Sequence, residues 1–362
     1  MKKFLSLVLA LVMTMSLVTV SAGAKDFTDD SEITYKEAVD VISALGVVDG
    51  YSDGDFRPDD VLTRGAAAKI ICNLILGPTT ASALAASTAP FKDVPVTNTF
   101  AGYITYCSQQ GIISGYADGT FRPTGTLSGN AFMKMLLGAL GYDSSIEGYT
   151  GANWQVSVIK QASGIGLDDG NDEFVGSKAV TRQEAALYAF NMLQATMVEY
   201  DQQNTIVVGD ITINTTSSRS DVENNGKSDK DINSDGKMQF AEKYCEDLVA
   251  KEGTDDAFGH PATEWKYDGS KIGTYADDAD NSVVMDKTKS LKDSLTSSDY
   301  MNYDNDDVLD SAKVYFNGYE LGEYKNLKSD DTYTGAGDIV EAYENDDDEV
   351  DTIVISRYVA AQ

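Results

Sequence analysis

Apolar residues in the first two hundred positions recur at helical spacing. Residues 35–45 carry one apolar stripe, at Ala38, Val39, Ile42 and Leu45, and Gly46 is placed to end that helix. The same spacing predicts further helices over 66–76, 131–140 and 184–193. Each of these three follows a hydroxyl residue suited to an N-cap: Thr63, Ser128 and Thr181. The first half of the chain is therefore expected to be helical.

The pattern changes after about residue 200. Threonine and valine alternate from 205 to 215, and the polar stretch 216–230 reads as a linker or long loop. A helix is expected over 238–250 and strands over 312–316, 338–343 and 351–359, the last two as a hairpin with an acidic loop. The fold class that follows is α+β, with an all-α N-terminal region and a smaller β-rich or α+β C-terminal region.

An internal repeat organises the helical half. Residues 46–58, Gly-Val-Val-Asp-Gly-Tyr-Ser-Asp-Gly-Asp-Phe-Arg-Pro, recur without a gap at 111–123 as Gly-Ile-Ile-Ser-Gly-Tyr-Ala-Asp-Gly-Thr-Phe-Arg-Pro. A weaker third copy matches at Gly164, Phe174 and 180–182. In each copy a helix leads into a turn-forming loop, whose phenylalanine is expected to pin the loop to the core, and then into a second helix. One such helix pair cannot bury its own apolar face, so the units should pack on each other.

At this point the sequence resembles the S-layer homology family. The resemblance is carried by residues 115–123, by the Thr-Arg pairs at 63–64 and 181–182, and by the unit openings Phe27-Thr-Asp29 and Phe91-Lys-Asp-Val-Pro95. It covers residues 26–195. It implies three repeats, over 26–84, 85–141 and 142–198, closing into a pseudo-threefold helical bundle. It also implies grooves between repeats that bind an anionic secondary cell-wall polysaccharide. A linker over 199–230 and an acidic C-terminal domain over 231–362 would follow.

Two arginines are the main candidates for contacting such a polymer. Arg64 and Arg182 directly follow the N-caps, in a first turn whose free N–H groups and dipole favour an anion. A guanidinium can meet a carboxylate with two parallel hydrogen bonds. The resemblance gives both arginines the role of ligand contacts; the alternative is a solvated or internally paired side chain. The second repeat has Gly129 where the arginine should stand, so its groove is predicted to be weak or silent.

Other positions complete the candidate polysaccharide site. Arg57 and Arg122, between Phe and Pro in tight loops, either bond loop carbonyls or contact the ligand. Tyr51 and Tyr116 either flank a sugar with their rings or cover the edge of the core. The set also includes Thr63 and Thr181.

Residues 231–242 fit the template of a calcium-binding EF-hand loop. The sequence Asp-Ile-Asn-Ser-Asp-Gly-Lys-Met-Gln-Phe-Ala-Glu carries oxygen donors at the template positions, with a glycine for the sharp turn. The candidate Ca²⁺ ligands are Asp231, Asn233, Asp235, the Lys237 carbonyl, Gln239 and Glu242. A plain acidic turn is the alternative.

Charge and the first residues bear on location and partners. The formal net charge is -30, and residues 201–362 hold 37 acidic against 15 basic side chains, which argues against nucleic acid or an anionic membrane as partner. Lys2 and Lys3, the apolar run 4–20 and the small residues 22–24 predict a signal peptide over 1–24, with a retained membrane anchor as the alternative. No later segment is apolar enough to span a bilayer, so no membrane insertion is expected after signal removal.

Cysteine and histidine content speaks against a disulfide scaffold and against catalysis. Cys72 and Cys107 read as small buried hydrophobes, with a bridge between them as the alternative. The only histidine, His260, precedes a proline and accompanies no nucleophile motif.

The favoured interpretation is a secreted cell-surface protein held non-covalently on an anionic wall polysaccharide. The alternatives are a wall-anchored hydrolase and a Ca²⁺-dependent, self-assembling or adhesive structural protein.

Overall fold

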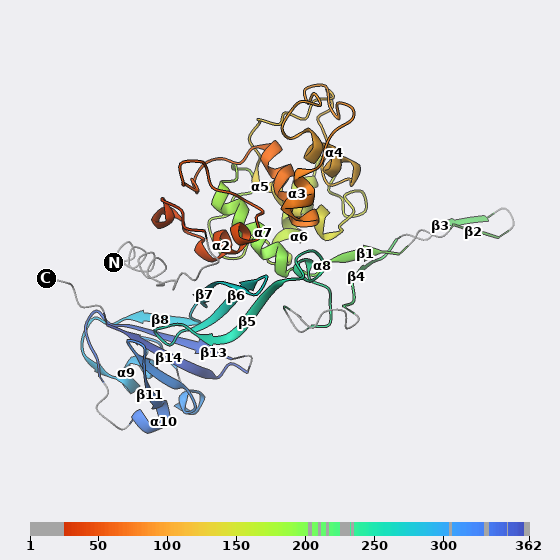
Figure 1. Cartoon of the computed structure of the whole chain (residues 1–362). Coiled ribbons are helices and arrows are strands. Elements are labelled where there is room, and N and C mark those ends of the chain that lie inside the picture. Colours follow the sequence, from red (N-terminus) through yellow and green to blue (C-terminus); the bar gives the residue numbers. More distant parts are fainter. Residues whose placement is uncertain are drawn as a thin grey trace. The chain divides into compact units, whose positions relative to one another are not determined.

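The computed structural model describes residues 25–201, 205–208, 211–214, 217–224, 232, 235–303, 306–328, 333–345 and 347–357. These residues form two compact units (Figure 1). The helical unit holds the described residues up to 249 together with 266–272, and the C-terminal unit holds 250–265 and those from 273 onward. The expected signal peptide, residues 1–24, lies outside the described residues.

Six α-helices and one 3-10 turn build most of the helical unit. They are η1 (Asp30–Glu32), α2 (Lys36–Ala44), α3 (Arg64–Ser82), α4 (Ala101–Gln109), α5 (Gly129–Leu140), α6 (Trp154–Gly164) and α7 (Arg182–Gln194). The predicted N-caps are confirmed, because the hydroxyls of Thr63, Ser128 and Thr181 each accept the N–H three residues ahead. Gly46 follows α2 with φ +68°, as expected of a helix stop. Within α3, Gly77 breaks the helix where the apolar pattern predicts its end.

A ring of three backbone hydrogen bonds ties the helical unit together. The Leu62 N–H donates to the Val180 carbonyl (2.9 Å), Val180 to Leu127 (2.9 Å), and Leu127 back to Leu62 (3.1 Å). All three side chains are buried. Each residue stands just before the N-cap of α3, α5 or α7, so the ring joins equivalent points of three successive helix pairs.

The core of this unit contains the residues that the repeat predicts. Phe56 and Phe121 are 0% and 1% exposed, which confirms that they pin their loops. Cys72 and Cys107 are fully buried, and their sulfur atoms lie 3.5 Å apart as free thiols rather than bonded. The hydrophobic interpretation of both cysteines is therefore confirmed.

The segment after α7 contains short ladders where a linker was expected. Strand β1 (Val198–Tyr200) pairs antiparallel with β4 (Arg219–Asp221), and β2 (Thr205–Val208) pairs with β3 (Ile211–Asn214). The helix predicted over 238–250 is wrong in extent. Only α8 (Phe240–Tyr244) forms, because Cys245 leaves helical geometry and residues 248 onward join a sheet. That three-stranded sheet orders β5 (Leu248–Asp255), β6 (Pro261–Tyr267) and β7 (Ser270–Ala276).

The C-terminal unit is built on a five-stranded sheet. Its order is β11 (Tyr319–Glu323), β10 (Lys313–Phe316), β14 (Val350–Ser356), β13 (Ile339–Glu344) and β8 (Asn281–Val284). Strands β10 and β14 run parallel, and β13–β14 is the predicted antiparallel hairpin. Short elements complete the unit: β9 (Lys289–Ser290), α9 (Leu291–Thr296), η2 (Asp306–Leu309), α10 (Tyr324–Leu327) and β12 (Tyr333–Thr334). The α+β class with a β-rich C-terminal region is thus confirmed.

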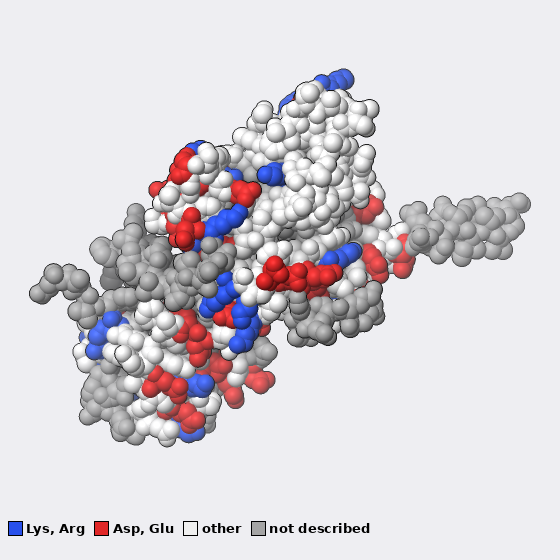
Figure 2. Space-filling view, viewed as in Figure 1, with Lys and Arg blue, Asp and Glu red and all other residues white. Residues whose placement is uncertain are grey.

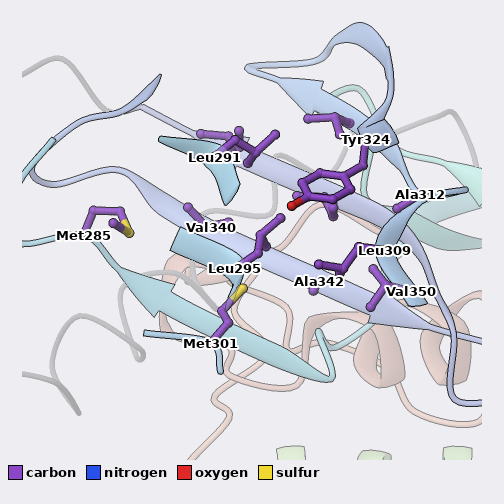
Figure 3. Packing of buried hydrophobic residues seen from close by; sticks show 13 residues of the cluster. Met285, Leu291, Leu295, Met301, Leu309, Ala312, Tyr324, Val340, Ala342 and Val350 are labelled. Carbon is purple, nitrogen blue, oxygen red and sulfur yellow. The ribbon is translucent and has the colours of Figure 1, made fainter. Parts of the chain in front are cut away.

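The larger buried cluster of the C-terminal unit lies on one face of this sheet, and a smaller one contains Tyr315, Tyr343 and Val354. Figure 3 shows Leu291 and Leu295 from α9 and Tyr324 from α10 packed over Val340 and Ala342 of β13. All five are buried, with exposures of 0–1%. The short helices therefore cover the sheet on that face.

Charge differs between the two units on the face drawn in Figure 2. Much of the helical unit is white there, whereas red acidic side chains recur over the C-terminal unit. Within the part of the chain that the structure describes, no helix combines the length and hydropathy of a membrane span.

Candidate ligand-binding site

The starts of α3, α5 and α7 are closed by backbone carbonyls from a neighbouring helix pair. In each case the first two helical N–H groups donate to loop carbonyls at 2.7–3.0 Å: Arg64 to Gly125, Gly65 to Pro123, Gly129 to Lys178, Asn130 to Gly176, Arg182 to Asp60 and Gln183 to Pro58. We name the three contacts the Arg64 junction, the Gly129 junction and the Arg182 junction. The prediction of free N–H groups for an anion is wrong, since neighbouring carbonyls already occupy them.

Both candidate arginines reach across their junctions to carbonyl oxygens. Arg64 Nε donates to Phe121 O (2.8 Å) and Nη2 to Ser114 O (3.2 Å). Arg182 repeats the arrangement, with Nε on Phe56 O (2.8 Å) and Nη2 on Asp49 O (2.8 Å). Among the described residues neither guanidinium has a carboxylate within ion-pair distance. Both are half-buried cations bonded only to neutral groups, and burial lowers the pKa of each.

Aromatic rings flank each of these guanidinium groups. The Arg64 guanidinium carbon lies 4.4 Å from the Phe121 ring centre and 5.0 Å from that of Tyr116. Arg182 lies 4.7 Å from Phe56 and 4.9 Å from Tyr51. Such cation–π contacts stabilise a charge that has left water. The two junctions are therefore built alike, although their arginines stand 118 positions apart in the sequence.

The tyrosine of each junction also contacts a second arginine. Arg57 lies 4.0 Å from the Tyr51 ring centre, and Arg122 lies 4.1 Å from that of Tyr116. Both tyrosines remain about two-fifths exposed, at 41% and 42%. They therefore do not simply cover the core edge: each ring contacts two arginines and still faces solvent.

The loops that present Arg57 and Arg122 are strained in the same way. These residues have φ of 58° and 61°, a left-handed conformation uncommon for arginine. The side chains bond Asp53 and Asp118 rather than the loop carbonyls of the structural hypothesis. Strained backbone of this kind concentrates at functional sites.

Two aspartates that sequence reasoning missed hold those loops. The Asp29 carboxylate accepts the N–H groups of Phe56 (2.7 Å) and Arg57 (2.6 Å). Asp93 accepts those of Phe121 and Arg122, both at 2.7 Å. Both stand in the repeated unit openings, Phe27-Thr-Asp29 and Phe91-Lys-Asp93, and that recurrence was the available signal.

The Gly129 junction differs from the other two. A Cβ at Gly129 would lie 2.9 Å from the Phe174 ring, so the ring fills the space where a side chain would begin. Val175 stands where the other units have Arg57 and Arg122, and it lacks their positive φ. The arginine-based arrangement is absent from this junction.

The hydroxyls of Thr63 and Thr181 serve their own helices. Each accepts an N–H of the first turn, from Ala66 and Glu184 at 3.3 Å. Thr181 also forms a reciprocal capping box with Glu184. Ligand contact by these threonines stays a prediction.

The expected calcium loop is described only in part. Asp231 and Asn233 lie outside the described residues. Glu242 accepts N–H donors on both carboxylate oxygens, from Ile232 (2.9 Å), the Asn224 amide (2.9 Å) and Gln239 (3.2 Å). Asp235 accepts from the Lys237 backbone and the Gln239 side chain. The described residues hold no group of three acidic, cysteine or histidine side chains placed for a metal. Calcium binding stays a prediction.

His260 lies between two carboxylates of the C-terminal unit. Its Nδ1 is 2.8 Å from Asp256 and its Nε2 is 3.2 Å from Glu341. Burial alone would lower the pKa of the imidazole, but the two carboxylates outweigh it and raise that pKa to about 9. The ring is therefore a charged crosslink at neutral pH.

Comparison with known proteins finds similarity in the segments that contain the repeated helix pairs. Residues 26–68 and 90–129 match the S-layer homology domain. A "Surface layer protein" of Brevibacillus choshinensis is 30% identical over 47% of this chain and 15% of its own length. A "Cellulosome-anchoring protein" of Acetivibrio thermocellus is 33% identical over 31% of this chain and 25% of its own. An "Endoglucanase" of a Bacillus species is 32% identical over 28% of this chain and 11% of its own length.

Two statements follow from these matches. The chain carries S-layer homology sequence in two segments, and it is a secreted protein of the cell surface. The chain matches only a quarter or less of the length of each of these relatives.

Proposed function

We propose that this protein anchors itself non-covalently to an anionic secondary cell-wall polysaccharide through the Arg64 and Arg182 junctions. The observation that carries the proposal is the pair of half-buried guanidinium groups with no carboxylate partner among the described residues. Removing a cation from water without an anion is unfavourable. A negatively charged sugar would supply the missing counter-charge.

The donors left over define how a sugar carboxylate would bind. Nε and Nη2 of each arginine already hold carbonyls, whereas no bond of either Nη1 is found within the described chain. Charge-assisted hydrogen bonds from Nη1 would hold one carboxylate oxygen. Arg57 or Arg122 lies on the same tyrosine, so a second guanidinium group, paired with Asp53 or Asp118, borders the site. The exposed ring offers an apolar surface for the sugar itself.

We infer that residues 142–198 are a third, diverged repeat of a pseudo-threefold bundle. The cyclic hydrogen bonds of Leu62, Leu127 and Val180 support this arrangement, as do the matching carbonyl contacts at the starts of α3, α5 and α7. In such an arrangement each arginine comes from one repeat and its tyrosine from another. The candidate site therefore depends on the packed bundle rather than on a single repeat.

Anchoring also accounts for the range of relatives. Proteins named for a surface layer, for cellulosome anchoring and for endoglucanase action share segments of this chain. A segment that recurs in proteins of such different names behaves as a portable module. Two equivalent sites on one module would hold a repetitive polymer more tightly than either alone.

Sedimentation of the mature chain, residues 25–362, with purified cell walls tests the proposal. Arg64→Gln with Arg182→Gln should weaken binding by about 100-fold, since each substitution removes a charge-assisted hydrogen bond to the polysaccharide. Lys69→Gln with Lys160→Gln removes the same charge elsewhere in the unit and should bind like wild type. Circular dichroism checks the fold, because both arginines also bond loop carbonyls. Undiminished binding by the folded arginine variant contradicts the proposal.

A further inference from the structure

Two cysteine thiols meet where the first helix pair packs against the second. Cys72 lies on α3 and Cys107 on α4, and their Sγ atoms are 3.5 Å apart in the core. Both side chains are fully buried. Each sulfur also lies 3.6 Å from a carbonyl oxygen of the facing helix, Cys72 from that of Tyr103 and Cys107 from that of Ala68. The two helices are therefore in close contact at this pair of thiols.

The repeat by itself does not require cysteine at either position. Leu137 stands 65 positions after Cys72, and Ile42 stands 65 positions before Cys107. Both of these residues are also fully buried, so the equivalent places in the repeat need only an apolar side chain. Either cysteine could serve as such a residue alone. The direct contact of the two sulfur atoms is the feature that burial does not explain.

The location of the protein gives this contact a chemical consequence. The chain is a secreted protein of the cell surface, and disulfides form and persist outside the reducing cytoplasm. The difference between the present sulfur separation and a bonded pair is about 1.5 Å, which is on the scale of a side-chain rotation. In the folded protein, contact with Cys107 and burial raise the pKa of Cys72, and the thiolate is the reactive form. Bond formation therefore belongs to the stage before α3 and α4 close on each other.

We propose that Cys72 and Cys107 form a disulfide when the exported chain folds, and that this bond joins the same two helix pairs that meet at the Arg64 junction. The oxidant is an external disulfide, either of low molecular weight or on another protein. One cysteine thiolate attacks it, forms a mixed disulfide and releases one thiol; the second cysteine then displaces the other thiol. Two protons and two electrons thus pass from the cysteines to the oxidant, which is reduced to two thiols.

Alkylation followed by mass spectrometry tests the bond in the mature chain taken from the cell surface. The protein is unfolded with iodoacetamide and without reductant, and is then digested with trypsin. Lys92 lies between the two cysteines, so their peptides separate unless they are bonded. We expect Cys72 and Cys107 in one linked pair of peptides that lacks two hydrogen atoms. Cys245, which is a free thiol, should be alkylated and serves as the internal control for the reagent.

Thermal unfolding of chain refolded with oxidised or reduced glutathione gives a second measurement. The oxidised chain should melt about 5–10 °C higher, because the bond restrains the unfolded chain. This difference should persist in Cys245→Ala and vanish in Cys72→Ala with Cys107→Ala. Alkylation of both Cys72 and Cys107 in the chain from the cell surface overturns the proposal, and so does a bond from either of them to Cys245. None of these measurements involves wall binding, so the anchoring proposal stands or falls separately.

Discussion

The junction arginines of the helical unit and two cations of the C-terminal unit are held differently. In the helical unit, Arg64 and Arg182 bond only to carbonyl oxygens and lie against aromatic rings. In the C-terminal unit, Arg357 meets both carboxylate oxygens of buried Asp338 at 2.7 and 2.6 Å, and His260 lies between Asp256 and Glu341. The first pair keeps its charge available, whereas the second pair is neutralised in place.

The presence or absence of a carboxylate partner separates structural cations from candidate binding cations better than solvent exposure of the side chain does. A neutralised cation is tied to stability, because removing it leaves a buried carboxylate without its partner. An uncompensated cation contributes hydrogen bonds to the fold but retains its attraction for an anion. Substitutions in the C-terminal unit should therefore change unfolding without changing wall binding, and the reverse should hold at the junctions.

The largest stability effect is expected at His260. A folded pKa of about 9 against the usual 6.5 means that the charged ring stabilises the C-terminal unit by about 3 kcal/mol. Because the folded pKa is raised, this contribution is full below about pH 6.5 and declines until it is lost above about pH 9. Denaturant unfolding followed by Trp265 fluorescence in a Trp154→Phe background measures it. His260→Asn should remove the pH dependence; a flat wild-type profile from pH 6 to 9.5 would contradict the crosslink.

Arg357→Gln should have the next largest effect. Asp338 is 1% exposed while Arg357 is 42% exposed, so loss of the arginine strands a buried carboxylate but leaves solvent some access. We expect the free energy of unfolding of the C-terminal unit to fall by about 2 kcal/mol. Wall binding should stay unchanged. A loss of wall binding by the folded variant would show that the two kinds of cation are not distinct.

Arg57→Gly with Arg122→Gly tests whether loop strain serves binding. Glycine adopts the left-handed conformation of these positions without strain. The melting temperature should therefore stay the same or rise by up to about 2 °C. Wall affinity should fall several-fold, because Asp53 and Asp118 lose their arginine partners and would repel an anionic sugar. A clear drop in melting temperature would assign these arginines a structural role instead.

Ca²⁺ should have the smallest effect, if residues 231–242 form the predicted loop. Glu242 already accepts N–H donors on both oxygens, so the ion would have to displace existing bonds. We expect 1 mM Ca²⁺ to stabilise the helical unit by only about 0.5–1 kcal/mol, and Asp231→Ala to abolish the effect. The absence of both heat on titration and a shift in melting temperature would reject the site.

Local features of the fold were predictable from sequence because they depend on neighbouring residues. The N-caps, the stop at Gly46 and the buried Phe56 and Phe121 all follow from short-range chemistry. The hydrogen-bond ring of Leu62, Leu127 and Val180 was not predictable, since each bond joins residues at least 53 positions apart.

The candidate site was also predictable only in the features that depend on local sequence. Its arginines and tyrosines follow from the repeat, but the carbonyls that fill the helix starts come from another helix pair. The helix expected over 238–250 failed for a related reason, since pairing in a sheet overrides local helical preference after Cys245.

The most direct test of the account is a crystal structure of the mature chain with a short acidic oligosaccharide from the producing organism's wall. The account predicts a sugar carboxylate within hydrogen-bond distance of Nη1 of Arg64 or Arg182, with the sugar beside Tyr116 or Tyr51. A bound oligosaccharide that leaves both guanidinium groups untouched would contradict it.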